Sequence, residues 1–344
     1  MQNSPFPLRS DRARDVVCVG TALIDHLSFA SLEVVRELGL AEGAMTLVDL
    51  ATAQRVAAAV GPGKAVSGGT VANTAVGVAG LGGRPAFVGA VANDELGGRY
   101  RDDLEESGVQ AILEWFPAVS EEGAGTGACY VIVTPNAERT MATTLGVSGL
   151  LGPGPIDDKL VASASLVYFD GYLLDFPQAE SIVSELVTRT RAAGTVLAMG
   201  LADPLVVARH YEKLVELLPA VDVVFANEAE AIALSGSADC MGALEMLARQ
   251  VTVAVVTRGQ AGAVLAAAGE LVSVPAAPVQ DVIDVTGAGD LFAAGVCYGL
   301  TSGLGISDCG RIGALCAAEV ISHLGARPAT SLAGLVRSAG LAGS

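Results

Sequence analysis

Residues 283–295 read Ile283-Asp-Val-Thr-Gly-Ala-Gly-Asp290-Leu-Phe-Ala-Ala-Gly295. Two glycines with one small residue between them let the backbone turn tightly, and the residues from Leu291 to Leu300 have helical character. The start of a helix collects unpaired N–H groups and the positive end of the helix dipole, so it suits an anion. This stretch therefore predicts an anion site formed by the backbone of Gly287, Ala288 and Gly289.

Asp290 adds a carboxylate to the same helix start. A carboxylate repels a bound phosphate, so it has little use in static anion binding. In phosphoryl transfer it is useful, because a base must take a hydroxyl proton while N–H donors stabilise the moving phosphoryl group. An ordinary capped helix with an acidic first turn is the alternative that these residues alone leave open.

Length and composition restrict the class of protein. The chain has 344 residues, of which 51% are hydrophobic, and this suits a globular α/β protein with a wide buried sheet. Its net charge of −17 argues against a nucleic-acid partner and against an anionic membrane surface. The longest uncharged window, residues 65–83, is rich in Gly, Ser, Thr and Asn, so we expect no membrane span.

The six cysteines show neither a Cys-x-x-Cys pair nor a matching histidine spacing, and three of them lie among apolar residues. We expect them to be small core side chains in a reducing compartment. The apolar run near the N-terminus, Val16 to Val19, is too short for a signal peptide. A cytoplasmic location is the simplest expectation.

The order of apolar segments predicts the architecture. From Leu150 onward strands and helices alternate, which is typical of a parallel sheet. Residues 109–146 differ, because three strands (111–116, 128–134 and 139–144) follow one another with a turn at 135–138. We expect these strands to form a separate small sheet. Residues 1–14 are expected to be a flexible tail.

Polar residues follow two segments near the N-terminal half. Asp25 comes after the strand at 15–20, and ligands of open α/β sheets bind beyond the carboxyl ends of the strands. Gly68 and Gly69 open a helix that carries Asn73 one turn in, where its amide can donate and accept together, as a vicinal diol requires. A solvated loop acid and a helix packed through small residues are the alternatives.

Three further segments have weaker signals. Asn227 and Glu230 open a helix after a strand, where they suit either a helix cap or carboxylate contacts to Mg²⁺ and its waters. Arg139, in a returning strand, either reaches the site or is a surface charge. Residues 123–128 resemble a dinucleotide loop, but a strand follows them where a helix is required, so we reject that site.

Taken together, these segments resemble the PfkB (ribokinase-like) kinases, which phosphorylate sugars and nucleosides. The family pattern Asp-x-Thr/Asn-Gly-Ala-Gly-Asp-x-Phe is matched at every position from Asp284 to Phe292. The resemblance implies a three-layer α/β/α domain with a mostly parallel central sheet and a small β lid. It assigns residues 15–22, 50–108 and 147–335 to the large domain, and residues 23–49 and 109–146 to the lid.

The resemblance also implies roles for individual residues. The backbone of Gly287, Ala288 and Gly289 becomes the anion hole and Asp290 the base. Mg²⁺ is expected near Glu230, through water, and an optional monovalent cation such as K⁺ beside Asp284. The expected substrate contacts are Asp25, Gly68, Gly69, Asn73, Arg139 and Tyr172. The expected ATP contacts are Asn227, Thr257, Gly259, Gly262, Thr286 and Gly325.

The sequence of residues 45–49 and 139–141 most resembles that of bacterial adenosine-kinase-like members, so an adenosine-like nucleoside is the expected substrate. Ribose, fructose or a related sugar is the alternative, because Asp25 and Asn73 would hold the diol of either. A non-catalytic sensor that keeps the fold is a third hypothesis. The apolar walls expected for a purine are Phe116, Tyr130, Tyr172 and Leu173. The assembly is expected to be a monomer or a homodimer through the lid.

Overall fold

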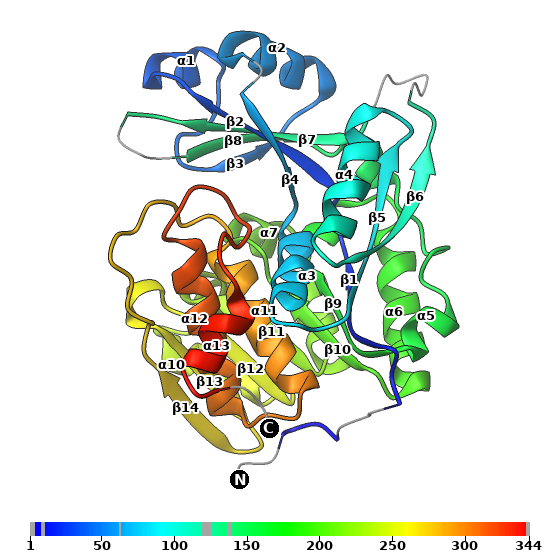
Figure 1. Ribbon diagram of the computed structural model, residues 1–344, viewed down its shortest axis with the longest axis vertical. Coiled ribbons are helices and arrows are strands. Elements are labelled where there is room, and N and C mark those ends of the chain that lie inside the picture. Colours follow the sequence, from blue (N-terminus) through cyan, green and yellow to red (C-terminus); the bar gives the residue numbers. More distant parts are fainter. Residues whose placement is uncertain (1–3, 8–10, 62, 119–124, 136–138, 342–344) are drawn as a thin grey trace.

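The computed structural model describes residues 4–7, 11–61, 63–118, 125–135 and 139–341 (Figure 1). A nine-stranded sheet forms the centre of the molecule, in the order β14-β13-β12-β11-β10-β9-β1-β5-β6. Its strands are β1 (Arg14–Val19), β5 (Pro85–Ala92), β6 (Gln110–Phe116), β9 (Ala164–Asp170), β10 (Val196–Gly200), β11 (Val223–Asn227), β12 (Val253–Thr257), β13 (Ala263–Ala267) and β14 (Glu270–Val274).

The sheet is mostly parallel, with antiparallel pairing only where β13 and β14 add to the β12 edge. Parallel strands covered on both faces are continuous apolar runs, and Val16 to Val19 in β1 has no exposed surface. All residues of β5 are buried as well. The three-layer α/β/α fold with a mostly parallel sheet is therefore confirmed.

Helices cover both faces of this sheet. The first face carries α5 (Asp158–Ala162), α6 (Ala179–Ala193), α7 (Pro204–Arg209), α8 (Tyr211–Leu217), α9 (Glu228–Ser235) and α10 (Cys240–Ala248). The second carries α3 (Thr70–Gly80), α4 (Glu95–Glu106), α11 (Ala288–Thr301) and α12 (Ile306–Val320), with α13 (Leu332–Ser338) packed outside them. Short 3-10 turns are η1 (Gly146–Leu150), η2 (Gly171–Asp175), η3 (Leu218–Ala220) and η4 (Gly259–Ala261).

A second sheet of five strands, here called the small sheet, lies over one end of the large sheet with two helices on its outer face (Figure 1). Its order is β3-β8-β7-β2-β4. The elements are β2 (Leu23–Phe29), α1 (Leu32–Glu37), β3 (Met45–Leu47), α2 (Leu50–Val60), β4 (Lys64–Gly68), β7 (Gly127–Val133) and β8 (Arg139–Thr144).

Side-chain alternation divides the small sheet into two faces. Ile132 and Ala142 pack with α1 and α2 on the outer face. The register pairs Asp25 with Cys129 and Val133 with Arg139, and these residues belong to the opposite set. Asp25 and Arg139 therefore share the inner face of the small sheet.

The expectation that residues 111–116 belong to the lid is wrong. They form β6, which pairs in parallel with β5 at the edge of the large sheet. The physical reason is α4, a mostly polar helix that makes a β5-α4-β6 crossover, and a crossover helix returns the chain parallel to the first strand.

The placement of residues 50–68 in the large domain is also wrong. α2 buries Val56 against Ile132 of the small sheet, and β4 pairs antiparallel with β2. A helix of this length has to bury its apolar stripe on a neighbouring sheet, and the small sheet offers the nearest one.

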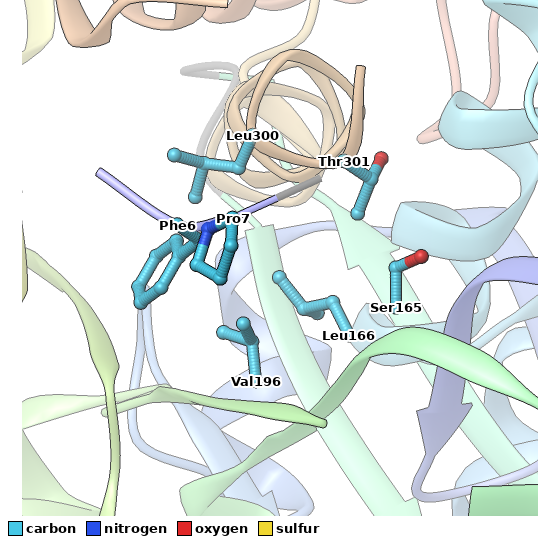
Figure 2. A pocket seen from close by; sticks show the side chains of 7 residues that line it. All are labelled: Phe6, Pro7, Ser165, Leu166, Val196, Leu300 and Thr301. Atoms are coloured by element: carbon cyan, nitrogen blue, oxygen red, sulfur yellow. The ribbon is translucent and has the colours of Figure 1, made fainter. Parts of the chain in front are cut away.

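The expected flexible tail is wrong for the part of residues 1–14 that is described. Phe6 packs against the core, and the guanidinium of Arg12 donates to the carbonyl oxygens of Ala162 and Ala193. Figure 2 shows Phe6 and Pro7 lining a small cavity together with Leu300, which lies in the last turn of α11.

Two expected features fall wholly or partly outside the described residues. Residues 136–138 of the expected turn are not among them, and neither are residues 123 and 124 of the rejected dinucleotide loop. The strand expected after that loop is present as β7, which agrees with the rejection. In the described ranges, no single helix is long and apolar enough to cross a membrane, and only the bent pair α9–α10 meets the length and composition when taken together.

Candidate active site

The start of α11 has the backbone geometry of an anion site. Gly287 is its N-cap residue and has a left-handed φ of 79°, which favours glycine. A Cβ at this position would also approach the Cα of Ala326 to 2.8 Å, so no side chain fits. Gly289 faces open space. The N–H of Ala288 donates to the carbonyl of Val285 at 3.2 Å. The other first N–H groups of a helix have no intrahelical partner, so this end of α11 can bind an anion.

Asp290 lies in the first turn of α11, against α3. The amide nitrogen Nδ2 of Asn73 donates to Oδ2 of Asp290 at 3.0 Å, and Thr74 Oγ1 donates to the Asp290 carbonyl at 3.2 Å. Burial raises the pKa of Asp290 to about 7; the Asn73 hydrogen bond lowers it, and the charges of Asp170 and Asp25 raise it further. The carboxylate is thus a base near neutral pH.

Asn73 and Asp25 both retain unused hydrogen-bonding capacity. The Oδ1 atom of Asn73 is buried and has no partner among the described residues. Asp25 lies so close to Gly68 that any Cβ at Gly68 would overlap its carboxylate, so glycine is required there. Burial raises the pKa of Asp25 to about 7, although Arg327 and Arg139 lower it. Both side chains are therefore available to hydroxyl groups of a ligand.

Asp170, at the carboxyl end of β9, is a residue that sequence reasoning missed. It is 2% exposed, and its Oδ2 accepts a hydrogen bond from Thr70 Oγ1 at the start of α3. Burial raises its pKa to about 6. A charged residue that closes an apolar strand at the carboxyl edge of a sheet is the signal that would have found it.

Arg139 crosses from the small sheet to the loop before α11. Its guanidinium forms an ion pair with Asp284 and donates to Thr286 Oγ1 at 2.6 Å. Asp284 also accepts from the N–H of Thr286 at 2.9 Å and from the N–H of Gly325 at 2.7 Å. Of the two alternatives for Arg139, the structure shows the one in which it reaches inward, and only 14% of its side chain is exposed.

Glu230 and Asn227 form a capping box at the start of α9. The Glu230 carboxylate accepts from the backbone N–H and the side-chain amide of Asn227, at 2.9 and 2.6 Å, and the Glu230 N–H donates back to Asn227 Oδ1. Burial raises the pKa of Glu230 to about 7. The structure therefore shows the cap directly, and a contact to Mg²⁺ would be additional.

The expected ATP contacts at Thr257, Gly259 and Gly262 lie at the end of β12 and in the turn that follows it. Gly262 has a φ of 81°, and a Cβ there would collide with the carbonyl oxygen of Val274. The turn is closed by a hydrogen bond of 2.7 Å from the N–H of Arg258 to the carbonyl of Gly262. Its neighbour Gly259 is exposed, so the backbone of the turn is accessible to a ligand.

Of the four expected apolar walls, Tyr172 lies beside the site, in η2 directly after Asp170. Burial raises its pKa, and the charges of Asp203, Asp170, Asp290 and Glu230 raise it further.

The prediction is wrong for the other three side chains. Phe116 and Leu173 pack in the core on the first face of the large sheet. Tyr130 lies on the outer face of the small sheet, stacked on His26. Side-chain alternation explains the last error, because Cys129 and Val131, not Tyr130, point inward.

Comparisons with known proteins agree with this fold. The family described as "pfkB family carbohydrate kinase" matches residues 14–332. The adenosine kinase of Sinorhizobium meliloti is 38% identical, with a TM-score of 0.89 over 95% of this chain and 99% of that one. A probable sugar kinase of Rhizobium etli is 36% identical, with a TM-score of 0.91 over 96% of this chain and 100% of that one. Adenosine kinase of Saccharomyces cerevisiae is 26% identical over 90% of this chain and 95% of its own length.

Proposed function

The chain belongs to the pfkB family of carbohydrate kinases, ATP-using phosphotransferases with an alcohol acceptor, and we propose that it phosphorylates the hydroxymethyl group of an adenosine-like nucleoside. One observation carries the proposal. The carboxylate of Asp290 stands in the first turn of the helix whose N–H groups suit an anion, and Asn73 donates to it at 3.0 Å.

In this reaction Asp290 takes the proton of the substrate hydroxyl as the oxygen attacks the γ-phosphorus of ATP. The bond from that phosphorus to the bridging oxygen breaks, and ADP leaves. The backbone N–H groups at the start of α11 stabilise the charge on the transferred phosphoryl group. Asp25 and Asn73 hold the ring hydroxyls, so the hydroxymethyl group is oriented towards Asp290.

ATP and Mg²⁺ are assigned to the carboxyl edge of β11 and β12. The exposed backbone at Gly259 suits phosphate oxygens, and we assign Asn227, Thr257, Gly262, Thr286 and Gly325 to the same nucleotide. Mg²⁺ fits near Glu230 if water lies between them, because both carboxylate oxygens already accept hydrogen bonds from Asn227. When bound, the metal neutralises phosphate charge.

K⁺ does not fit beside Asp284 in this arrangement. The carboxylate already pairs with the guanidinium of Arg139 and accepts two backbone N–H groups, from Thr286 and Gly325. A second cation would face that guanidinium at short range. No step of the reaction is therefore assigned to K⁺.

The preference for a nucleoside rests on apolar surface that a free sugar does not need. Leu23, Cys129 and Val131 form a cluster on the inner face of the small sheet, with Met141 packed against it. Tyr172 adds an aromatic ring near Asp290. We propose that the small sheet acts as a lid whose inner face covers the base. The similarity to a probable sugar kinase favours a free sugar as the second candidate.

The test is a panel of adenosine, inosine, ribose and fructose with ATP and Mg²⁺, followed by detection of ADP. We expect the wild-type protein to prefer a nucleoside, and Asp290→Asn to lower kcat at least 1,000-fold with ATP binding intact. Asp308→Asn changes an exposed first-turn acid of α12 and is the matched control. Near-normal turnover by Asp290→Asn would revive the sensor hypothesis. A strong preference of the wild-type protein for a free sugar would favour the sugar-kinase alternative over the nucleoside kinase.

A further inference from the structure

The segment that joins α12 to α13 holds Arg327 in a fixed position. Two residues before it, the N–H of Gly325 donates to Asp284 at 2.7 Å. Two residues after it, the N–H of Ala329 donates to the buried carboxylate of Glu319 at 2.9 Å. Hydrogen bonds therefore hold the backbone on both sides of Arg327.

The guanidinium of Arg327 lacks the partners that its burial requires. Its Nε and Nη2 atoms are buried and have no hydrogen-bond partner among the described residues. Burial lowers the pKa of Arg327, so the fold destabilises the charge instead of satisfying it. Leaving buried charged donors unpaired is costly, and such a group is expected to meet an acceptor from a ligand.

Neighbouring polar groups indicate on which side of the site the guanidinium lies. The groups that raise the pKa of Arg327 are Tyr100, Asp103 and Asp25, all of which belong to α4 or β2. Arg327 is in turn the foremost of the charges that lower the pKa of Asp25. Tyr100 and Asp25 meet at Gly68, because the Tyr100 hydroxyl donates to the Gly68 carbonyl at 3.1 Å and a Cβ at Gly68 would overlap the Asp25 carboxylate. The guanidinium therefore lies on the side of the site that holds Asp25.

Arg327 and Asp25 do not contact each other directly. The ion pairs within 4.0 Å among the described residues do not include Arg327, so a gap separates the two groups. A carboxylate can only accept hydrogen bonds, and a guanidinium can only donate them. A hydroxyl group satisfies both at once, because it donates its hydrogen to one and accepts at its oxygen from the other.

We propose that Arg327 is a substrate-binding residue that donates to the ring hydroxyl whose hydrogen Asp25 accepts. The inference rests on the proposed function only in requiring a substrate with a hydroxylated sugar ring, which a nucleoside and a free sugar both have. It deepens that function by assigning the donor partner of the hydroxyl. The guanidinium is rigid and always charged, so it fixes one hydroxyl orientation better than lysine would.

The test measures binding without ATP by calorimetry, using adenosine, 2′-deoxyadenosine, 3′-deoxyadenosine, ribose and 2-deoxyribose. We expect Arg327→Gln to weaken the hydroxylated ligand about 10-fold or more, and to leave the analogue that lacks the contacted hydroxyl nearly unchanged. Arg327→Lys should lie between wild type and Arg327→Gln. Arg311→Gln, which removes an exposed arginine of α12, is the matched control. Thermal melting of each variant checks that it folds.

Each result has one reading. Equal weakening of hydroxylated and deoxy ligands would overturn the proposal, and so would unchanged binding by Arg327→Gln. Unchanged nucleoside and sugar binding with a raised KM for ATP would assign Arg327 to the phosphates instead. Failure of the wild-type protein to bind any nucleoside or sugar would overturn the proposed function as well, whereas the preceding outcomes overturn only the role of Arg327.

Discussion

The side chain of Asn73, near the start of α3, donates a hydrogen bond of 3.0 Å to the carboxylate of Asp290, in the first turn of α11. This contact joins two residues that are 217 positions apart in the chain. It stabilises the charged form of Asp290, while the nearby charge of Asp170 and burial favour the protonated form. The pKa of about 7 is the balance of these opposing effects.

That balance predicts how activity depends on pH. A base acts only when it is deprotonated, so kcat/KM of the wild-type enzyme should rise as the pH increases through about 7. Asn73→Ala removes a hydrogen bond that lowers the pKa, and should move the midpoint to higher pH. Asp170→Asn removes a charge that raises the pKa, and should move the midpoint to lower pH.

Opposite shifts are the informative result, because general damage to the site would lower kcat/KM without moving the midpoint in either direction. Asp25 has a pKa of about 7 as well, so the profile of Asp25→Asn has to be recorded beside them. Asp308→Asn, remote from the base, should leave the midpoint unchanged. Shifts of the same sign in Asn73→Ala and Asp170→Asn would show that Asp290 does not control the profile.

Local sequence predicted the start of α11 and the alternation of strands and helices, because glycine geometry and apolar runs are properties of neighbouring residues. It failed for β6, because β6, β7 and β8 follow one another with no helix among the described residues between them, whereas β6 pairs with β5 across the preceding helix α4. It failed for Tyr130 because a shift of one residue along a strand exchanges the two faces.

Asp170 and Arg327 were missed for a different reason. Each is an unremarkable charge at a strand end or in a loop until tertiary contacts bring it beside Asp290 or Asp25. Pairs such as Arg139 with Asp284 depend on where the small sheet lies over the large one, which local sequence does not encode.

The pair of Arg139 and Asp284 predicts a stability effect. Arg139→Gln leaves the buried Asp284 with only its backbone donors, and should lower the free energy of unfolding by about 2–3 kcal/mol. Arg139→Lys should cost less, since it keeps the charge but cannot bridge Asp284 and Thr286 together. Urea unfolding measures both values, with the exposed Arg101→Gln as a control. Wild-type stability in Arg139→Gln would mean that the small sheet is not held closed in solution.

Substitution of Glu230 distinguishes a role in capping α9 from a role in binding Mg²⁺. Gln at the third position of a helix still completes a capping box, so Glu230→Gln should keep the melting temperature nearly unchanged. If the charge holds water on Mg²⁺, the Mg²⁺ concentration for half-maximal activity should rise roughly 10-fold. Glu228→Gln removes a more exposed acid of the same turn and is the control. An unchanged Mg²⁺ requirement would leave Glu230 as a cap only.

Tyr172 distinguishes the two substrate classes. It lies near Asp290, and if a purine stacks on its ring, Tyr172→Ala should lower kcat/KM for adenosine about 10-fold through lost apolar and stacking contact. The same change should leave residual ribose phosphorylation nearly unaltered, because ribose has no base. Tyr172→Phe keeps the ring and should retain most of the adenosine activity.

The comparison needs both substrates on each variant. A loss of ribose and adenosine activity by the same factor would mean that Tyr172 supports the site and does not contact a base. Tyr211→Ala, which removes an exposed tyrosine of α8, controls for the loss of an aromatic side chain. If Asp25 and Asn73 hold the ring hydroxyls as proposed, Asp25→Asn should weaken the binding of adenosine and ribose together. A nucleoside kinase is expected to show both results: the change at Tyr172 affects adenosine and not ribose, whereas the change at Asp25 affects both substrates.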